Sequence, residues 1–437
     1  MRSPFPGLVV PGLVAAVVVL LVAACASVAP PAADREAALN VIAEDYVHLI
    51  LEIGEHEPGY VDAYYGPEEW PAEARAELRS VPELTAAATT LLAGIEAVPE
   101  AGLTPELRQR RAYLRAHVSA AHARLRMIAG ETMGFADEAE ALFGIRPELR
   151  PLESFDPVLA RLDALLPGEG SINARLGAFR GGTAIPRDRQ EVVIAAAIAE
   201  CKARTEAHID LPAGENFTLE FVTDKPWSGY NWYQGQSQSL IQINVDQPIS
   251  IERAIDLGCH EGYPGHHVYN MLLEKTFVRE KGWVEMSVYP LYSPMSLIAE
   301  GSANYGIDLA FPGETRGDWE RAVLYPLAGL NPQKVELQTA ILDITRELAR
   351  AEYTIADDYL SGRADRETTI QHLIKYGLHS RGSAERRIRF IDTYRSYIIN
   401  YGLGRDMVQD WVESQGPDHW STMERLLGSQ ILPTDLL

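Results

Sequence analysis

Residues 260–267 read H-E-G-Y-P-G-H-H, and this octapeptide constrains the fold more than any other feature of the 437-residue chain. Pro264 has no N–H to donate, and its ring collides with the preceding helical turn, so a helix cannot run straight through it. Gly265 can absorb the resulting bend because glycine has no Cβ. The octapeptide is therefore predicted to form a bent helix that presents three histidines.

His260 and Glu261 match the start of the H-E-x-x-H pattern, in which two histidines one turn apart bind zinc and the glutamate takes a proton from water. The position of the second histidine is occupied by Pro264. If the Pro-Gly pair forms a bulge, His266 becomes the second ligand and His267 a hydrogen-bond donor behind the ligands. The alternative is His267 as ligand, because seven residues make nearly two turns. We favour His266, since His267 would lie about 10.5 Å along a straight helix from His260.

Glu300 is the predicted third ligand, because a catalytic zinc site has three protein ligands and one open position. It lies in a neutral stretch of small residues, 295–310, that is predicted to form a buried helix. A buried carboxylate needs a partner, since an unpaired buried charge costs several kcal/mol. A metal ion would be that partner; an arginine or a helix N-terminus is the alternative. Asp308 is the fallback ligand.

The chain after residue 33 predicts a mainly helical fold, because apolar residues recur at helical spacing along most of it. No linker divides it. We predict one helical domain over residues 34–437, with an N-terminal helical part, 34–210, and a catalytic part, 211–437. Helices are expected, among other places, over residues 332–360 and 384–401.

A small β-sheet is expected just before the histidine motif, where β-branched and aromatic residues alternate with polar ones between residues 216 and 245. Its last strand, from Leu240 to Val245, contains the candidate substrate-binding residues Ile241, Ile243 and Asn244. We predict that this strand pairs with the backbone of an extended peptide. A plain structural hairpin is the alternative.

The N-terminus is predicted to be a targeting segment. Residues 1–24 form a signal peptide that ends in L-V-A-A before Cys25, which is similar to a bacterial lipobox, and residues 25–33 form a lipidated cysteine and tether. An uncleaved transmembrane anchor is the alternative. Because Ala26 rather than Asp follows the cysteine, we expect a lipid anchor in the outer membrane, facing the periplasm of the bacterial envelope.

The formal net charge of −22 argues against a nucleic-acid partner, because an acidic surface repels polyphosphate. Oligomeric state is not indicated by any pattern. Apart from Cys25, only Cys201 and Cys259 are present, and this pair could be bridged or free. We interpret Cys259 as a buried packing residue rather than a metal ligand, because on a helix its side chain points about 100° away from that of His260.

The octapeptide is similar to the H-E-x-x-P-G-H-H signature of a bacterial family known as a domain of unknown function. That family is grouped with the zincin-like metallopeptidases, and many members are predicted lipoproteins. Its second signature, E-G-x-A-x-Y, is similar to residues 300–305, E-G-S-A-N-Y, with Ser302 where the family usually has Trp. The resemblance implies a neurolysin-like helical zincin fold with His260, His266 and Glu300 as zinc ligands and Glu261 as general base.

A zincin also needs a donor that stabilises the developing oxyanion. The family's C-terminal motif is not evident here, so several residues are candidates: Tyr394, Arg395, Tyr397, Tyr376 and His379. Arg395 is also a candidate substrate-binding residue. The leading hypothesis is a metallopeptidase with one Zn²⁺ and a peptide substrate. The alternatives are a metal-dependent amidase or esterase, and a non-catalytic envelope lipoprotein that binds peptides or peptidoglycan fragments.

Overall fold

The computed structural model describes Met1 and residues 32–225 and 227–437. The predicted signal peptide, the lipidation site at Cys25 and most of the tether lie outside the described residues. The first helix, α1 (Ala32–His56), begins at the end of the predicted tether. In the described part of the chain, no helix is long and apolar enough to cross a membrane.

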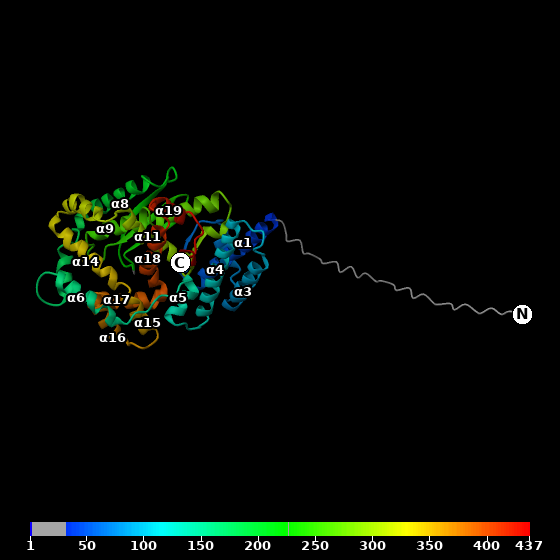
Figure 1. Ribbon diagram of the computed structural model, residues 1–437, viewed down its shortest axis with the longest axis horizontal. Helices are drawn as coiled ribbons and strands as arrows, with labels where there is room; N and C mark the ends of the chain where they lie inside the picture. Colours follow the sequence, from blue (N-terminus) through cyan, green and yellow to red (C-terminus); the bar gives the residue numbers. More distant parts are fainter. Residues whose placement is uncertain (2–31, 226) are drawn as a thin grey trace.

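The fold is mainly helical with two small sheets, as the hydrophobic pattern predicts. The N-terminal helices gather at one end of the molecule, drawn in blue and cyan in Figure 1: α1, α2 (Trp70–Ala76), α3 (Val81–Ala97), α4 (Pro105–Ile128) and α5 (Phe135–Phe143). Helix α4 begins after Thr104, whose side chain caps the helix by accepting a hydrogen bond from the Leu107 N–H. The apolar faces of α1, α3 and α4 pack together in the main hydrophobic core.

The small sheet before the motif has three strands, β2 (Asn216–Val222), β3 (Gly229–Gly235) and β4 (Gln238–Asn244), in the order β2-β4-β3. Strand β4 is parallel to β2 and antiparallel to β3. A second sheet pairs β1 (Val61–Tyr64) with β5 (Val288–Pro290).

The predicted role of the last strand in binding a peptide is wrong. Strand β4 is central, so both of its edges are already hydrogen-bonded. Ile241 and Ile243 are buried, and the Asn244 amide donates to the carbonyl oxygens of Lys225 and Trp227. The edge strand nearest the motif is instead β3, whose residues 229–232 line a cavity beside Glu261.

Helix α11 (Pro294–Ala310) is the predicted buried helix that carries Glu300, and it packs closely against α18 (Ile399–Ser414). The crossing requires glycine on both sides: a Cβ on Gly301 would lie 2.5 Å from the carbonyl oxygen of Gly404, and one on Gly404 would lie 2.7 Å from that of Leu297. The prediction that a helix ends near residue 401 is wrong, because α18 runs through this position from Ile399 to Ser414. Here the glycines allow α18 to continue beside α11 rather than ending it.

The predicted helix over residues 332–360 is divided in two, α14 (Val335–Leu348) and α15 (Ala351–Leu360). The remaining helices complete the fold. They are α6 (Asp156–Leu165), α7 (Ile172–Gly181), α8 (Gln190–Glu206), α9 (Glu252–Leu257), α10 (His266–Leu273), α12 (Thr315–Trp319), α13 (Tyr325–Ala328), α16 (Arg366–Lys375), α17 (Arg381–Tyr394) and α19 (His419–Leu427). Of these, α8 and α19 lie in the upper part of Figure 1 and α6 and α16 in the lower part.

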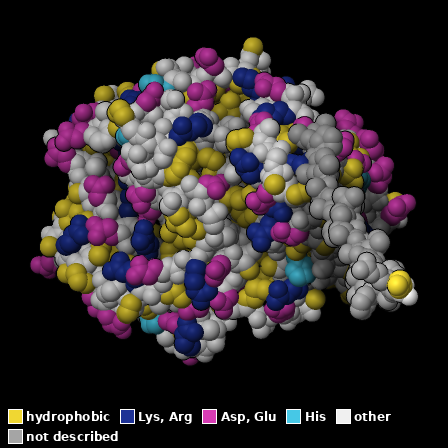
Figure 2. Space-filling model, turned by 45° about the vertical axis from the view of Figure 1, so that its right-hand side comes forward, with side chains coloured by type: hydrophobic (Ala, Val, Ile, Leu, Met, Phe, Trp, Pro, Cys, Tyr) yellow, Lys and Arg dark blue, Asp and Glu magenta, His cyan; other side chains and the backbone are white. Residues whose placement is uncertain are grey.

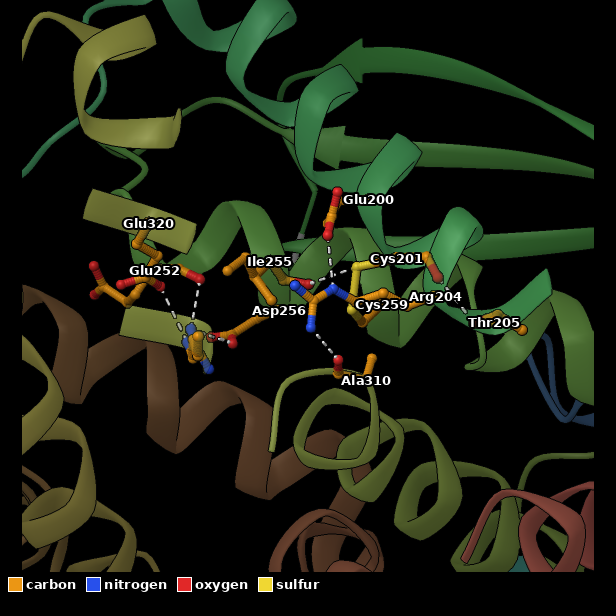
Figure 3. The surroundings of a disulfide bond; sticks show 11 residues. Glu200, Cys201, Arg204, Thr205, Glu252, Ile255, Asp256, Cys259, Ala310 and Glu320 are labelled. Atoms are coloured by element: carbon orange, nitrogen blue, oxygen red, sulfur yellow. Dashed lines mark hydrogen bonds and ion pairs between the residues drawn. A yellow bond between two sulfur atoms is a disulfide. The ribbon is translucent and has the colours of Figure 1, made fainter. Parts of the chain in front are cut away.

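A disulfide joins Cys201 of α8 to Cys259, the residue that precedes the first motif histidine, with 5.3 Å between the two Cα atoms. Figure 3 shows the bond lying between α8 and the motif segment. Both cysteines are fully buried, so Cys259 is a packing residue as predicted, and the pair left open by the sequence is bridged. Because the Cys259 sulfur is in the disulfide, it is not available as a metal ligand. The bond ties the motif to the helix behind it.

Candidate metal centre

The three predicted ligands come together in the structure. The Nε2 atoms of His260 and His266 are 3.2 Å apart, and the Oε2 atom of Glu300 lies 3.3 Å from the first and 3.7 Å from the second. Ligands of a tetrahedral zinc ion at 2.0–2.1 Å are separated by about 3.4 Å. A site of this kind needs three His, Cys, Asp or Glu side chains close enough together to bind one metal ion. Within the described residues, His260, His266 and Glu300 are the one such group. The donor set of two imidazoles and a carboxylate suits zinc.

The Pro-Gly break explains why His266 reaches the centre. A π-helical turn, η3 (Gly258–Gly262), carries His260 and Glu261, and α10 begins afresh at His266. Between them, the Gly265 N–H donates to the Cys259 carbonyl oxygen at 3.0 Å. A Cβ on Gly265 would lie only 1.8 Å from the carbonyl oxygen of His260. The chain therefore folds back on itself at a position that only glycine can occupy.

His267 does not act as a donor behind the ligands, and this prediction is corrected. Its buried ring makes hydrogen bonds at both nitrogens, Nδ1 with Ser239 Oγ at 2.8 Å and Nε2 with Glu215 Oε2 at 2.9 Å. Glu215 also accepts hydrogen bonds from Tyr263 and Lys202. His267 thus ties the start of α10 to Ser239 of the three-stranded sheet and to Glu215.

Glu300 has the properties expected of a ligand for a cation. Its Oε1 atom accepts a hydrogen bond from the Tyr397 hydroxyl at 2.8 Å, whereas its Oε2 atom is buried without a hydrogen-bond partner in the described chain. Burial raises the pKa of Glu300, but His260 and His266 offset this effect and lower the pKa below its ordinary value. Burial lowers the pKa of His266, and Glu300 more than reverses this, raising it to about 9. The pocket between these atoms therefore favours positive charge.

The position of Tyr397 makes it a positioning residue for Glu300 rather than a free oxyanion donor. Replacing Tyr397 by phenylalanine is expected to weaken zinc binding about tenfold, because partners that orient metal ligands typically contribute 10–100-fold. Competition for zinc with a chromophoric chelator measures the change. Tyr394→Phe is the matched control and should leave zinc affinity unchanged. Equal affinities for wild type and Tyr397→Phe would contradict the orienting role.

Glu261 lies beside the three ligands but is not one of them. Its backbone carbonyl accepts a hydrogen bond from the Asn231 amide at 2.6 Å, and its buried side chain lies next to Gly229 of the edge strand. A Cβ on Gly229 would come within 2.8 Å of Glu261 Oε1, so the glycine leaves room for the carboxylate. Glu261 is thus a carboxylate beside the candidate metal centre that also lines the cavity.

Asp62 and Tyr230 also face this site, and neither is predicted from the sequence. The Tyr230 hydroxyl donates to Asp62, and both residues line the same cavity as the ligands. Burial raises the pKa of Asp62 to about 6, although the Tyr230 hydrogen bond opposes the shift. The one signal in the sequence is an isolated acid within the aromatic segment 59–67.

The cavity has a volume of about 860 Å³ and is lined by the three candidate metal ligands, Glu261 and, of the oxyanion-donor candidates, Tyr394 and Tyr397. The Tyr394 hydroxyl makes no hydrogen bond within residues 32–225 and 227–437, and Tyr394 lines the cavity, so the hydroxyl is available to a substrate. In Figure 2, hydrophobic side chains lie in the middle of the visible face, and Lys and Arg as well as Asp and Glu side chains lie around them.

Four other candidates have different partners. Arg395 forms an ion pair with Glu138 at 2.7 Å and does not line the cavity, which corrects its predicted role in substrate binding. His379 pairs with Glu352, and the Tyr376 hydroxyl accepts a hydrogen bond from Lys375. The fallback ligand Asp308 pairs with two arginines, Arg346 and Arg405.

No protein-family model and no curated protein matches the chain. Among solved structures, a candidate lipoprotein from Colwellia psychrerythraea is similar, with a TM-score of 0.52 and 15% sequence identity over 83% of this chain. The match spans 64% of that protein's length. An M32 carboxypeptidase from Deinococcus radiodurans R1 gives a TM-score of 0.35 and 14% identity over 92% of this chain and 94% of its own. The first likeness shows a shared fold alone.

Proposed function

We propose that the protein is a zinc-dependent peptidase with Glu261 as general base. The observation that carries this proposal is the triangle formed by His260, His266 and Glu300, with a buried carboxylate oxygen that has no hydrogen-bond partner in the described chain. A non-ligand glutamate stands beside the triangle, in a cavity large enough for several residues of a peptide.

The residues of the chain have separate tasks in this proposal. When bound, zinc supplies a Lewis acid that polarises a carbonyl group and lowers the pKa of water. Glu261 accepts the proton of the attacking water and passes it to the leaving amine. Tyr394 donates its hydroxyl hydrogen to the oxyanion that develops at the carbonyl. Tyr397 holds Glu300 in place through its hydrogen bond.

Strand β3 is the proposed support for the substrate backbone. It pairs with β4 along one edge, and within the described sheets its other edge has no strand partner. An edge strand offers unpaired N–H and C=O groups to an extended peptide. Residues 229–231 of this strand line the cavity beside Glu261. A peptide added there would lie with its backbone alongside the general base.

Zinc content and peptide hydrolysis of the purified protein test the proposal together. We expect one zinc ion per chain, lost in His260→Ala and retained in His122→Ala, a partly exposed histidine of α4 that lies outside the cavity. Wild type and His122→Ala should cleave a mixed peptide library, and His260→Ala should not. Folded wild-type protein that binds no zinc would contradict the proposal and favour a peptide-binding lipoprotein.

The alternative substrates are distinguished by the same assay. A metal-dependent amidase or esterase would use the same centre but leave peptides intact while cleaving simple amides or esters.

The proposed place of action is the bacterial cell envelope, with a lipid anchor at Cys25, and the shared fold with a candidate lipoprotein supports it. Labelling with a radioactive fatty acid, absent in Cys25→Ala, tests the anchor.

A further inference from the structure

One face of α11 connects the metal centre to a group of arginines. Glu300, Asn304 and Asp308 follow one another at intervals of four residues, so they lie along one side of the helix. Glu300 is at the metal centre, whereas Asp308 pairs with Arg346 and Arg405. Eight residues of α-helix rise about 12 Å. The arginines therefore stand at the far end of the same cavity.

Four arginines, carried on or next to four different helices, line this end of the cavity, and we call them the arginine wall. They are Arg346 of α14, Arg350 at the start of α15, Arg387 of α17 and Arg405 of α18. Within residues 32–225 and 227–437, Arg346, Arg350 and Arg405 form ion pairs with only two carboxylates, those of Asp308 and Asp406. Among these ion pairs the three arginines outnumber the carboxylates by one, although the protein as a whole is strongly acidic.

Two of these arginines have guanidinium N–H groups that make no hydrogen bond within the described chain. Arg346 and Arg350 each use one terminal nitrogen in their hydrogen bonds to residues of the described chain. A guanidinium group has five N–H donors in a fixed fork. The Arg346 side chain is 42% exposed and the Arg350 side chain is 40% exposed. Both can therefore contact a substrate without a conformational change that exposes them. Such forks match the two oxygens of a carboxylate.

We propose that the arginine wall binds a carboxylate group of the peptide substrate while the scissile bond lies at the metal centre. This inference rests on the proposed peptidase function and adds the substrate class. An extended peptide advances about 3.3 Å per residue. A span of about 12 Å therefore places the carboxylate two to four residues from the bond that is cleaved. The carboxylate is either the free C-terminus of a short peptide or an acidic side chain.

Matched peptides distinguish these two sources. One pair differs only in a free or amidated C-terminus, and a second pair of amidated peptides differs only in Glu or Gln three residues from the scissile bond. Wild type should cleave the carboxylate member of one pair with a KM about tenfold lower than its neutral counterpart. A preference in the first pair identifies the C-terminus, and one in the second pair alone identifies an acidic side chain.

The double variant Arg346→Gln/Arg350→Gln tests the wall itself. It should raise KM about tenfold for the preferred carboxylate peptide, leave KM for the neutral partner within twofold, and leave kcat nearly unchanged. Arg321→Gln is the matched control, because its side chain is 41% exposed, pairs with Asp318 and lies outside the cavity. Zinc content reports whether each variant is folded, and the single variant Arg346→Gln replaces the double variant if that one is not.

The experiments can contradict the proposed carboxylate subsite and the proposed peptidase function separately. If wild type cleaves both members of each pair equally well, or if the variant and the control behave alike, the arginine wall does not bind substrate, although the peptidase function stands. If no peptide is cleaved, calorimetric binding of the same peptides to the Glu261→Gln protein still tests the wall. Equal binding of the charged and neutral peptides would overturn it, and tighter binding of the charged one would support it.

Discussion

Replacing Glu261 by glutamine is expected to lower kcat for peptide hydrolysis about 1,000-fold, within the range of 10²–10⁴ that a general base contributes. Glutamine keeps the size of the side chain but cannot accept the proton of the attacking water. Zinc content should stay at one ion per chain, because Glu261 is not among the three side chains that converge on the centre. Steady-state kinetics with a fluorogenic peptide and metal analysis of the same sample measure both effects.

Glu314→Gln, an exposed change of the same kind in the loop after α11, should leave kcat and zinc content at wild-type values. Two outcomes would contradict the assignment, and each has its own meaning. Full activity in Glu261→Gln would show that another group takes the proton, and Asp62 would be the next residue to replace. Loss of zinc together with activity would show that Glu261 is a ligand.

The predictions that hold depend on short-range rules. The Pro-Gly break within the octapeptide predicts that the helix bends, and the bend brings His266 next to His260. Glu300 is predicted because a carboxylate in a neutral, buried helix needs a compensating charge. Both arguments use residues within one or two helical turns. Helical periodicity likewise predicts the class of fold.

The predictions that fail depend on how distant segments meet. Alternation predicts strands at the two ends of segment 216–245 but misses β3 between them, and pairing with both β2 and β3 makes β4 the central strand. Arg395 is turned toward Glu138, a partner 257 residues earlier in the chain. Asp62 reaches the site from near the N-terminus. Glycines near residue 402 predict a helix end, yet in the structure they allow two helices to cross closely.

The second large effect concerns the backbone of the octapeptide rather than its chemistry. Gly265 has φ −75° and ψ −137°, and a Cβ there would lie 1.8 Å from the His260 carbonyl oxygen and 2.5 Å from that of Cys259. These atoms belong to the backbone, so no side-chain rotation can relieve the collision. Gly265→Ala is therefore expected to displace His266 from His260 and to abolish zinc binding. The overlap should also lower the free energy of unfolding by about 3 kcal/mol or more, the upper range for overpacking.

Gly262→Ala makes the same substitution three residues earlier and provides the control. A Cβ at this position would lie 3.5 Å from the Phe217 ring, an ordinary van der Waals contact. We expect this variant to keep its zinc and to unfold in urea close to the wild-type midpoint. If Gly265→Ala bound zinc as tightly as Gly262→Ala, the chain could not follow the path that joins η3 to α10. The backbone path from η3 to α10 is what places His266 next to His260. Without that path, His260, His266 and Glu300 could no longer be assigned as the three ligands.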